Sequence, residues 1–329
     1  MLYVTLCIGI LLLFFCSDYL VRGSVAMAIK FEIPPIIIGL TIVAFGTSAP
    51  ELVISLRSAL IGSTGLAIGN VVGSNIANIL LVLGLPALIF TTNCKQPFVK
   101  RNSLFVIGSS LIFIALCKLG PLTLWHGIIL LALMTGFLIE TAFWASQSLE
   151  KTTIGIETKE LIGEISGLLG RNLLIAVYMI FGLIGLPVAA HLTVTSAVQI
   201  AREFGVSETT IGLSLVALGT SLPELATTLS AAFRGQSGLA LGNVLGSNLF
   251  NILGVMGLVT LVAPINVPNV LLNLDLWIMM AAALAIVPFI FFNVKMTRLS
   301  GLAFVGFYLL YIFNVLVQRQ SGLDVAALS

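Results

Sequence analysis

Charged residues are scarce in this sequence. Only 9% of its 329 residues are Asp, Glu, Lys or Arg, whereas 59% are hydrophobic and the mean hydropathy is +1.16. Soluble domains carry about 25% charged residues, so the composition excludes a soluble globular protein and predicts an integral membrane protein. The net charge of +2 does not indicate a nucleic-acid partner, because basic residues in such a chain report membrane topology.

Histidine and cysteine are also rare. The two histidines and four cysteines contain no CxxC pair and no other spacing typical of metal ligands. This absence argues against a zinc-type centre, and we expect buried small side chains plus one loop thiol, Cys94. No nucleophile–base set or phosphate-binding loop occurs either, so we predict neither an enzyme nor a resident cofactor. The amino terminus lacks a basic segment and a cleavage site, which predicts a retained first span.

Apolar runs long enough to cross a bilayer, about 20 residues each, predict ten transmembrane helices. Their approximate ranges are 3–29, 35–60, 66–92, 103–118, 122–146, 171–201, 208–232, 238–264, 270–293 and 299–317. The polar interval 148–170 separates two five-helix halves, residues 1–147 and 171–329. The predicted fold is therefore all-α, with a linker between two halves of the membrane domain.

The two halves contain a direct sequence repeat. Residues 39–80 align without a gap with residues 212–253, and 25 of the 42 pairs are identical. The shift is 173 residues, the separation between Glu51 and Glu224. Glu51 lies in the second predicted span and Glu224 in the seventh, and because this offset of five spans is odd, the second copy enters the membrane inverted. Inverted repeats are typical of secondary transporters, whose substrate site lies near the midplane between the repeats.

Lysine and arginine predict the orientation of the chain. Four of them fall on one side, which holds both termini: Arg57, Lys118, Arg202 and Arg319. The other eleven fall on the side of the central linker: Arg22, Lys30, Lys95, Lys100, Arg101, Lys151, Lys159, Arg171, Arg234, Lys295 and Arg298. This excess predicts a cytoplasmic linker and termini that face outward.

Each repeat places polar groups at membrane depth. Glu51 lies 13 residues before Thr64, in the predicted turn Gly62–Gly65, and Asn78 lies 14 residues after it. At about 1.5 Å of rise per residue, both side chains lie roughly 20 Å from the turn, near the bilayer centre. Glu224 and Asn251 repeat this arrangement. A carboxylate at that depth is expensive, and by default it marks a functional site facing the bundle interior.

The neighbouring residues add further oxygen atoms. Thr47 and Ser48 precede Glu51 by four and three residues, and Ser74 lies four residues before Asn78, so each group shares one helix face. The second copy supplies Thr220, Ser221 and Ser247. Carboxylates, amides and hydroxyls without thiolate or imidazole favour hard cations such as Ca²⁺ and Na⁺ over zinc or copper.

A proline follows each of these hydroxyl pairs. Pro50 and Pro223 should break their helices and free a carbonyl about one turn earlier. The carbonyls of Ala44 and Ala217 are the ones we expect to be freed. Irregular backbone is acceptable at membrane depth only where it lines a cavity. A competing interpretation is that the glycines and small residues, including the GxxxG spacing of Gly69 and Gly73, serve helix packing alone.

Other polar residues give weaker signals. Asp18, Glu140 and Asp275 lie near span ends, where we expect them to reach the headgroup region, and His126 and His191 also have interfacial positions. The acidic linker could be a regulatory cation site, although a solvated connection is the simpler interpretation.

The paired motifs GTSAPELVIS with GNVVGSNIANIL and GTSLPELATT with GNVLGSNLFNIL resemble the alpha-repeats of the calcium/cation antiporter superfamily. Over all ten spans the chain looks like the compact bacterial inner-membrane calcium/sodium antiporters. The resemblance implies that Glu51 and Glu224 are the central Ca²⁺ ligands, and that spans 1 and 6 slide across the remaining helices. It also implies a ligand set for Ca²⁺ and Na⁺ completed by Thr47, Ser48, Ser74, Asn78, Thr220, Ser221, Ser247, Asn251 and the carbonyls of Ala44 and Ala217. Some relatives carry Asp where this chain has Asn251, which leaves stoichiometry and K⁺ involvement open.

Three functions compete on this reading. The first is exchange of Ca²⁺ for Na⁺ by alternating access, which one chain suffices to perform. The second is H⁺/Ca²⁺ exchange at the same site, with the two glutamates carrying protons; the hydroxyl groups favour Na⁺. The third is a cation channel, which the lack of a repeated filter loop disfavours.

Overall fold

The computed structural model describes residues 1–148, 167–168, 170–204 and 217–326, and all of these that form regular structure are helical. Within these ranges the β-type pairings are two isolated bridges between loops, Thr92 with Met296 and Leu122 with Ile265. The linker predicted at 148–170 lies almost entirely outside the described residues, as does the start of the span predicted at 208–232.

The first half consists of α1 (Leu2–Lys30), α2 (Pro35–Ile38), η1 (Gly39–Val43), α3 (Ala44–Thr47), α4 (Ala49–Leu60), α5 (Thr64–Ala77), η2 (Asn78–Val82), α6 (Gly84–Ile89), α7 (Val99–Lys118) and α8 (Leu124–Ser148). The second consists of α10 (Asn172–Glu203), α12 (Ala217–Thr220), α13 (Leu222–Phe233), α14 (Ser237–Leu249), η4 (Phe250–Val255), α15 (Met256–Val262), η5 (Leu271–Asp275), α16 (Leu276–Ala285), α17 (Val287–Phe291) and α18 (Arg298–Ala326). The η segments are π-helical turns within longer helices.

Eight helices in the described ranges are long and apolar enough to cross a membrane, and the bent pair Pro35–Thr47 and Ala49–Leu60 makes a ninth candidate. These nine match nine of the ten predicted spans. The protein is therefore a multi-pass membrane protein.

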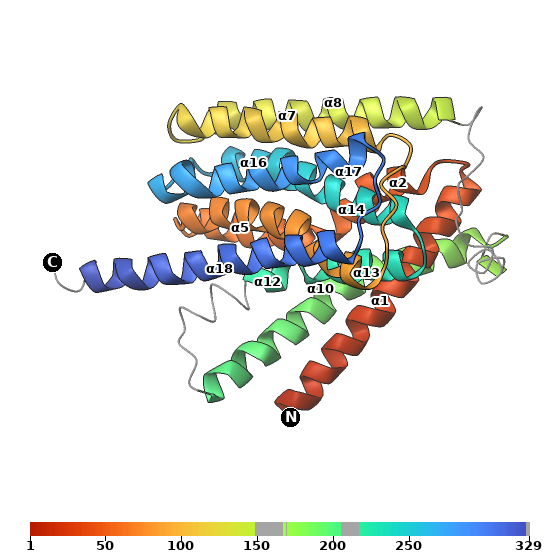
Figure 1. Ribbon diagram of the computed structural model, residues 1–329, viewed down its shortest axis with the longest axis horizontal. Helices are drawn as coiled ribbons and strands as arrows, with labels where there is room; N and C mark the ends of the chain where they lie inside the picture. The colour runs from red at the N-terminus through yellow and green to blue at the C-terminus, as the bar shows by residue number, and fades with distance from the viewer. Residues whose placement is uncertain (149–166, 169, 205–216, 327–329) are drawn as a thin grey trace.

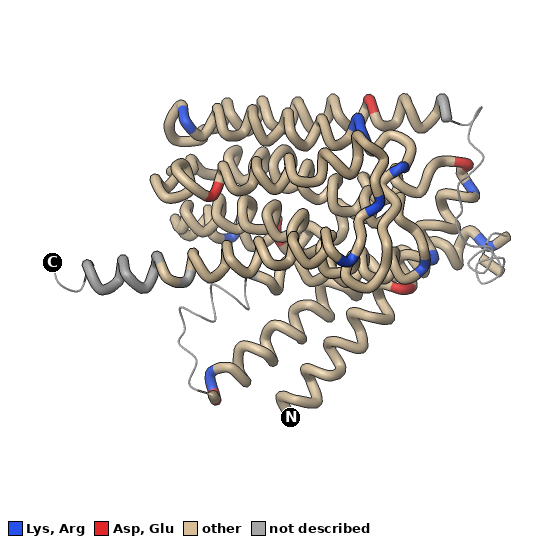
Figure 2. Tube along the Cα trace, in the orientation of Figure 1, with Lys and Arg blue, Asp and Glu red and all other residues tan. Residues whose placement is uncertain are grey.

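The helices form layers (Figure 1). Helices α7, α8, α16, α5 and α18 run roughly along the long axis, while α1 and α10 lie side by side and cross obliquely at one face. Most basic segments gather toward one end of the helices, as Figure 2 shows. The helices α5 and α14 are the most enclosed, and every residue of α14 is buried.

Helices α1 and α10 run antiparallel in close contact, and two of their contacts are related by the repeat. A Cβ added to Gly9 would lie 2.5 Å from the hydroxyl of Thr193, and one added to Gly182 would lie 2.5 Å from Cβ of Leu20. The shift of 173 residues converts Gly9 into Gly182 and Leu20 into Thr193. The two contacts therefore exchange under the repeat, as expected for elements related by a two-fold axis.

The predicted turns after the broken helices are confirmed. Gly62 and Gly235, which are equivalent in the repeat, have φ angles of +81° and +67° directly after the ends of α4 and α13. Because this left-handed conformation strains residues with a Cβ atom, glycine is favoured there.

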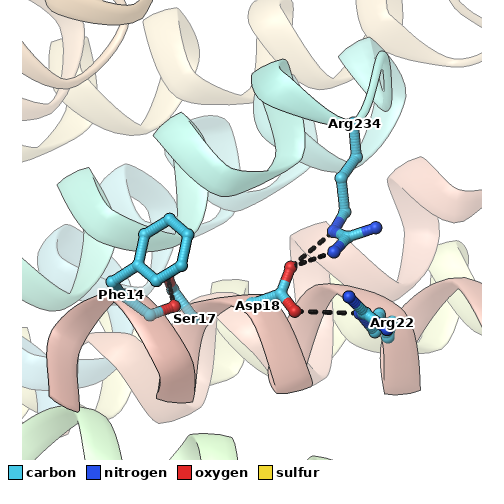
Figure 3. Close-up of polar contacts among 5 residues, drawn as sticks. All are labelled: Phe14, Ser17, Asp18, Arg22 and Arg234. Carbon is cyan, nitrogen blue, oxygen red and sulfur yellow. Dashed lines mark hydrogen bonds and ion pairs between the residues drawn. The ribbon is translucent and has the colours of Figure 1, made fainter. Parts of the chain in front are cut away.

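The acidic residues near span ends, Asp18, Glu140 and Asp275, are each partly or largely covered by the protein. Asp18 lies between two arginines (Figure 3): one carboxylate oxygen forms an ion pair with Nε of Arg22 at 2.8 Å, and the other contacts Arg234, whose Nε donates at 2.6 Å. Glu140 pairs with Arg101 at 3.0 Å, and the Asp275 residue is only 7% exposed. Asp18 and Glu140 thus have arginine partners from distant parts of the chain, Arg234 and Arg101, and their depth in the headgroup region stays a prediction.

Candidate functional site

Each repeat breaks its helix at a serine. Ser48 separates α3 from α4 with φ and ψ of −85° and 7°, and Ser221 separates α12 from α13 with −87° and 5°. A proline occupies the first turn after each break, where a missing N–H group is tolerated. Glu51 and Glu224 lie in these same first turns, where the positive end of the half-helix dipole stabilises a carboxylate.

The two glutamates face a common interior region. Both are fully buried, and Glu51 lies within electrostatic range of Glu224. The hydroxyl of Ser48, from the first half, donates to Oε1 of Glu224 at 2.8 Å. The hydroxyl of Ser221, its equivalent, has no hydrogen-bond partner among the described residues, so the two halves surround their glutamates differently there.

The remaining hydroxyls meet across the boundary between the halves. Thr47 lies 3.5 Å from Ser247, and Ser74 lies 3.5 Å from Thr220, measured between hydroxyl oxygens. The repeat shift exchanges these two pairs with one another. All four residues are at most 5% exposed, so the structure brings these sequence-predicted residues together in an enclosed site.

Asn78 and Asn251 are fully buried, and no atom of either side-chain amide has a hydrogen-bond partner. Each lies in a π-helical segment, η2 or η4, of a kind frequently found at functional sites. Both carboxylate oxygens of Glu51 and one of Glu224 are also without a partner. Buried polar groups are normally hydrogen-bonded, so such a concentration of exceptions calls for an ion or water.

The donor atoms suit a hard cation. The groups left without partners are carboxylate, amide and hydroxyl oxygens together with amide nitrogens, and oxygen ligands are what Ca²⁺ and related ions use. Within the described residues, no three His, Cys, Asp or Glu side chains form a cluster that would hold a softer metal. The two carboxylates supply enough negative charge to neutralise one divalent ion.

The prediction that the Ala44 carbonyl is free of main-chain hydrogen bonds is wrong. Its oxygen accepts a backbone hydrogen bond from Ser48 N–H at 3.0 Å and faces the Thr47 hydroxyl at 3.4 Å. In the second half, Ser221 N–H instead donates to the carbonyl of Leu218 at 3.1 Å, and Ala217 opens α12. The first helix breaks at Ser48, two residues before Pro50, and not a full turn before that proline as predicted.

Two residues beside the site, Asn70 and Asn243, are not predicted by the sequence pattern. Nδ2 of Asn70 donates to the main-chain carbonyl of Glu51 at 3.3 Å and to the Ser55 hydroxyl at 3.0 Å. Nδ2 of Asn243 donates to the carbonyl of Glu224 at 3.3 Å and to the Thr228 hydroxyl at 3.0 Å. A Gly-Asn pair occurs in both repeats and could have indicated these residues, but the GxxxG spacing that contains it is also typical of helix packing.

The chain is similar to known cation exchangers. The profile of a family described as sodium/calcium exchanger protein matches residues 1–141 and 174–317. Inner membrane protein YrbG of Escherichia coli is 37% identical, over 79% of this chain and 79% of its own length. Sodium/calcium exchanger MaX1 of Methanosarcina acetivorans is 30% identical, over 94% and 97%. A solved structure of the sodium-calcium exchanger NCX_Mj superposes with a TM-score of 0.80 and 30% identity, over 95% of this chain and 98% of that one.

Proposed function

Because the chain belongs to the sodium/calcium exchanger family, we propose that it is a secondary antiporter that exchanges Ca²⁺ for Na⁺ across a membrane. It acts as a transporter and not as an enzyme, without a resident cofactor. One observation carries this proposal: two buried carboxylates and two buried asparagines from both halves have side-chain polar atoms that, apart from Oε1 of Glu224, lack partners among the described residues.

The architecture we propose is ten transmembrane helices in two inverted repeats, residues 1–147 and 171–329, joined by a linker at 148–170. The exchange of the Gly9–Thr193 and Gly182–Leu20 contacts supports the inversion, as does the exchange of the hydroxyl pairs at the site. The basic end of the helices in Figure 2 is proposed to face the cytoplasm, so that both termini face outward. The membrane is proposed to be the bacterial inner membrane, as the name of YrbG indicates for that relative.

In the proposed cycle, Glu51 and Glu224 bind one Ca²⁺ together with oxygens of Asn78 and Asn251. Sodium ions compete for overlapping positions near the hydroxyls of Thr47, Ser74, Thr220 and Ser247, with Ser48, Ser221 and the carbonyl of Ala217 as further ligands. Two carboxylates left bare in an enclosed site repel each other and lack solvation. Only a loaded site therefore allows the closed arrangement to convert, and this links the movement of one ion to that of the other.

The alternative counter-ion is H⁺, with the glutamates themselves titrating. The hydroxyl pairs across the boundary favour Na⁺, because a proton carrier needs only the carboxylates and no further oxygen ligands. Potassium is a further possible substrate. A single chain supplies both carboxylates, so we propose that a monomer suffices for transport.

The test is Ca²⁺ uptake into proteoliposomes containing the purified protein, with Na⁺, K⁺ and H⁺ gradients imposed separately. We expect uptake with a Na⁺ gradient and none with a pH gradient alone. Glu51→Gln and Glu224→Gln should each abolish the flux, whereas Glu32→Gln, in an exposed turn, should leave it unchanged. Uptake driven only by the pH gradient would establish the proton alternative, and normal flux in either site variant would exclude that glutamate as an essential ligand.

A further inference from the structure

Asn70 and Asn243 connect the helices that carry the two kinds of proposed ligand. Asn70 lies on α5, four residues before Ser74 and eight before Asn78, so the three side chains share one helix face. Its amide reaches across to α4, where it bonds the carbonyl of Glu51 and the hydroxyl of Ser55 one turn later. One amide group therefore joins the glutamate turn to the ligand-bearing face of α5. We call these two hydrogen bonds of one asparagine amide a strap.

The second half repeats this strap with different surroundings. Asn243 is fully buried on α14, in the same register before Ser247 and Asn251, and it bonds the carbonyl of Glu224 and the hydroxyl of Thr228. Its Oδ1 atom also accepts a hydrogen bond from the hydroxyl of Thr47 at 3.2 Å. Because Thr47 belongs to the first half, Asn243 connects the glutamate turn of one repeat to a proposed ligand of the other.

We propose that Asn70 and Asn243 are positioning residues of the ion site. Neither is assigned a direct contact with the ion. Each fixes a glutamate turn against the helix that carries the serine and asparagine ligands of its own half, and Asn243 also sets the approach of Thr47. This inference rests on the proposed function, because it assumes that these side chains bind the transported ion.

The geometry explains why such a strap matters for affinity. Ca²⁺ is bound by six to eight oxygens at about 2.3–2.6 Å, and a site must hold its ligands to about half an ångström to use them together. The glutamates lie next to a helix break, where the α3–α4 pair bends by 43° and the main chain is less constrained by its own helix. The amide hydrogen bonds supply the missing constraint from the neighbouring helix.

The variants that test the proposal are Asn70→Ala and Asn243→Ala in the full-length protein. Exchange is measured in proteoliposomes as KM for Ca²⁺ and maximal rate separately, and Ca²⁺ binding is measured by calorimetry in detergent. We expect KM and Kd to rise at least tenfold in Asn243→Ala. Asn70→Ala should show a smaller rise, about threefold or more, because Asn243 makes the additional bond to Thr47.

Two matched comparisons separate positioning from folding. Asn102→Ala removes another fully buried asparagine, on α7 and outside both straps, and should leave KM unchanged even where it lowers the melting temperature. Thr228→Val removes only the hydroxyl that Asn243 binds, whereas Thr228→Ser keeps a hydroxyl and reproduces Ser55 of the first half. The valine variant should raise KM about threefold and the serine variant should retain the wild-type value.

Each outcome bears on one proposal. Wild-type KM and Kd in both asparagine variants would overturn the positioning role, even if the variants melt at lower temperature. If Asn243→Ala does not fold, equal KM values for Thr228→Val and Thr228→Ser would overturn it instead. A wild-type protein that binds Ca²⁺ but does not exchange it would refute the antiporter proposal, and the Kd values of the variants would still decide the positioning role.

Discussion

Replacing Asp18 by asparagine should destabilise the contact between α1 and α13. The Asp18 carboxylate is shared by Arg22 and Arg234, with side-chain exposures of 17% for Asp18 and 10% for Arg234. Removing one partner from a buried ion pair costs about 3–5 kcal/mol, because it leaves an uncompensated charge. Since Asp18 keeps some contact with solvent, we expect a loss near the lower end, about 3 kcal/mol. Arg22→Gln should cost only about 0.3–0.5 kcal/mol, because that arginine is 29% exposed and the pair lies within one helix.

The assay is unfolding of the purified protein in detergent, followed by tryptophan fluorescence, with Asp18→Asn, Arg22→Gln, Arg234→Gln and the double variant of Asp18 and Arg234 compared. The double variant should lose less than the sum of the single losses, because each single variant leaves the other charge unpaired. The reasoning from burial is refuted if Asp18→Asn loses no more stability than Arg22→Gln. It is also refuted if the loss in the double variant equals the sum of the losses in Asp18→Asn and Arg234→Gln.

Three further outcomes are expected. In chelator without Na⁺, Ser48→Ala should lower the free energy of unfolding by about 1.5–3 kcal/mol, because it removes a hydrogen bond to a carboxylate. Ser221→Ala should change it by less than about 0.5 kcal/mol, because that hydroxyl has no partner among the described residues. Both are measured by thermal melting, and equal losses would contradict the asymmetry of the site. Gly242→Ala should cost about 1–3 kcal/mol in the same assay, since its methyl group would overlap the carbonyl of Ile36; an unchanged melting temperature would show that the helices can separate there. Burial raises the pKa of the Cys94 thiol to about 11, so its thiolate forms only as the pH approaches that value, and disulfide-exchange labelling at pH 8 should require unfolding.

The sequence was informative about the site because the repeat doubled every signal. Glu51 and Glu224 could be placed at one depth by counting residues from two turns, and the structure has those turns and a helix break in both copies. The π-helical segments were not predictable, because the helices that contain them are buried on most sides, and a one-residue shift of the helix face leaves no mark in a continuous apolar run.

Contacts between distant residues were not predictable for a different reason. Asp18 and Arg234 are separated by 216 residues, and no local pattern indicates that an aspartate near a span end has a guanidinium partner. Asn70 and Asn243 occupy equivalent positions in the two repeats. A glycine-rich helix face, however, predicts close packing whether or not its asparagine donates a hydrogen bond to the neighbouring helix. Side-chain hydrogen bonds depend on the relative placement of helices, which sequence periodicity does not specify.

The ligands of the two halves are equivalent, but their surroundings are not. The repeat shift converts Asp18 into His191 and Arg234 into Ile61, so the ion pair at that end of the molecule has no counterpart in the other half. In the proposed alternating-access cycle the inverted halves exchange conformations, and a contact between the halves that has no repeat-related counterpart then contributes to one access state only. An equilibrium between two states shifts by the free energy that differs between them. If the Asp18 pair breaks in the opposite state, about 3 kcal/mol would favour the observed arrangement by roughly a hundredfold, and the bound ions must offset that bias for the cycle to turn.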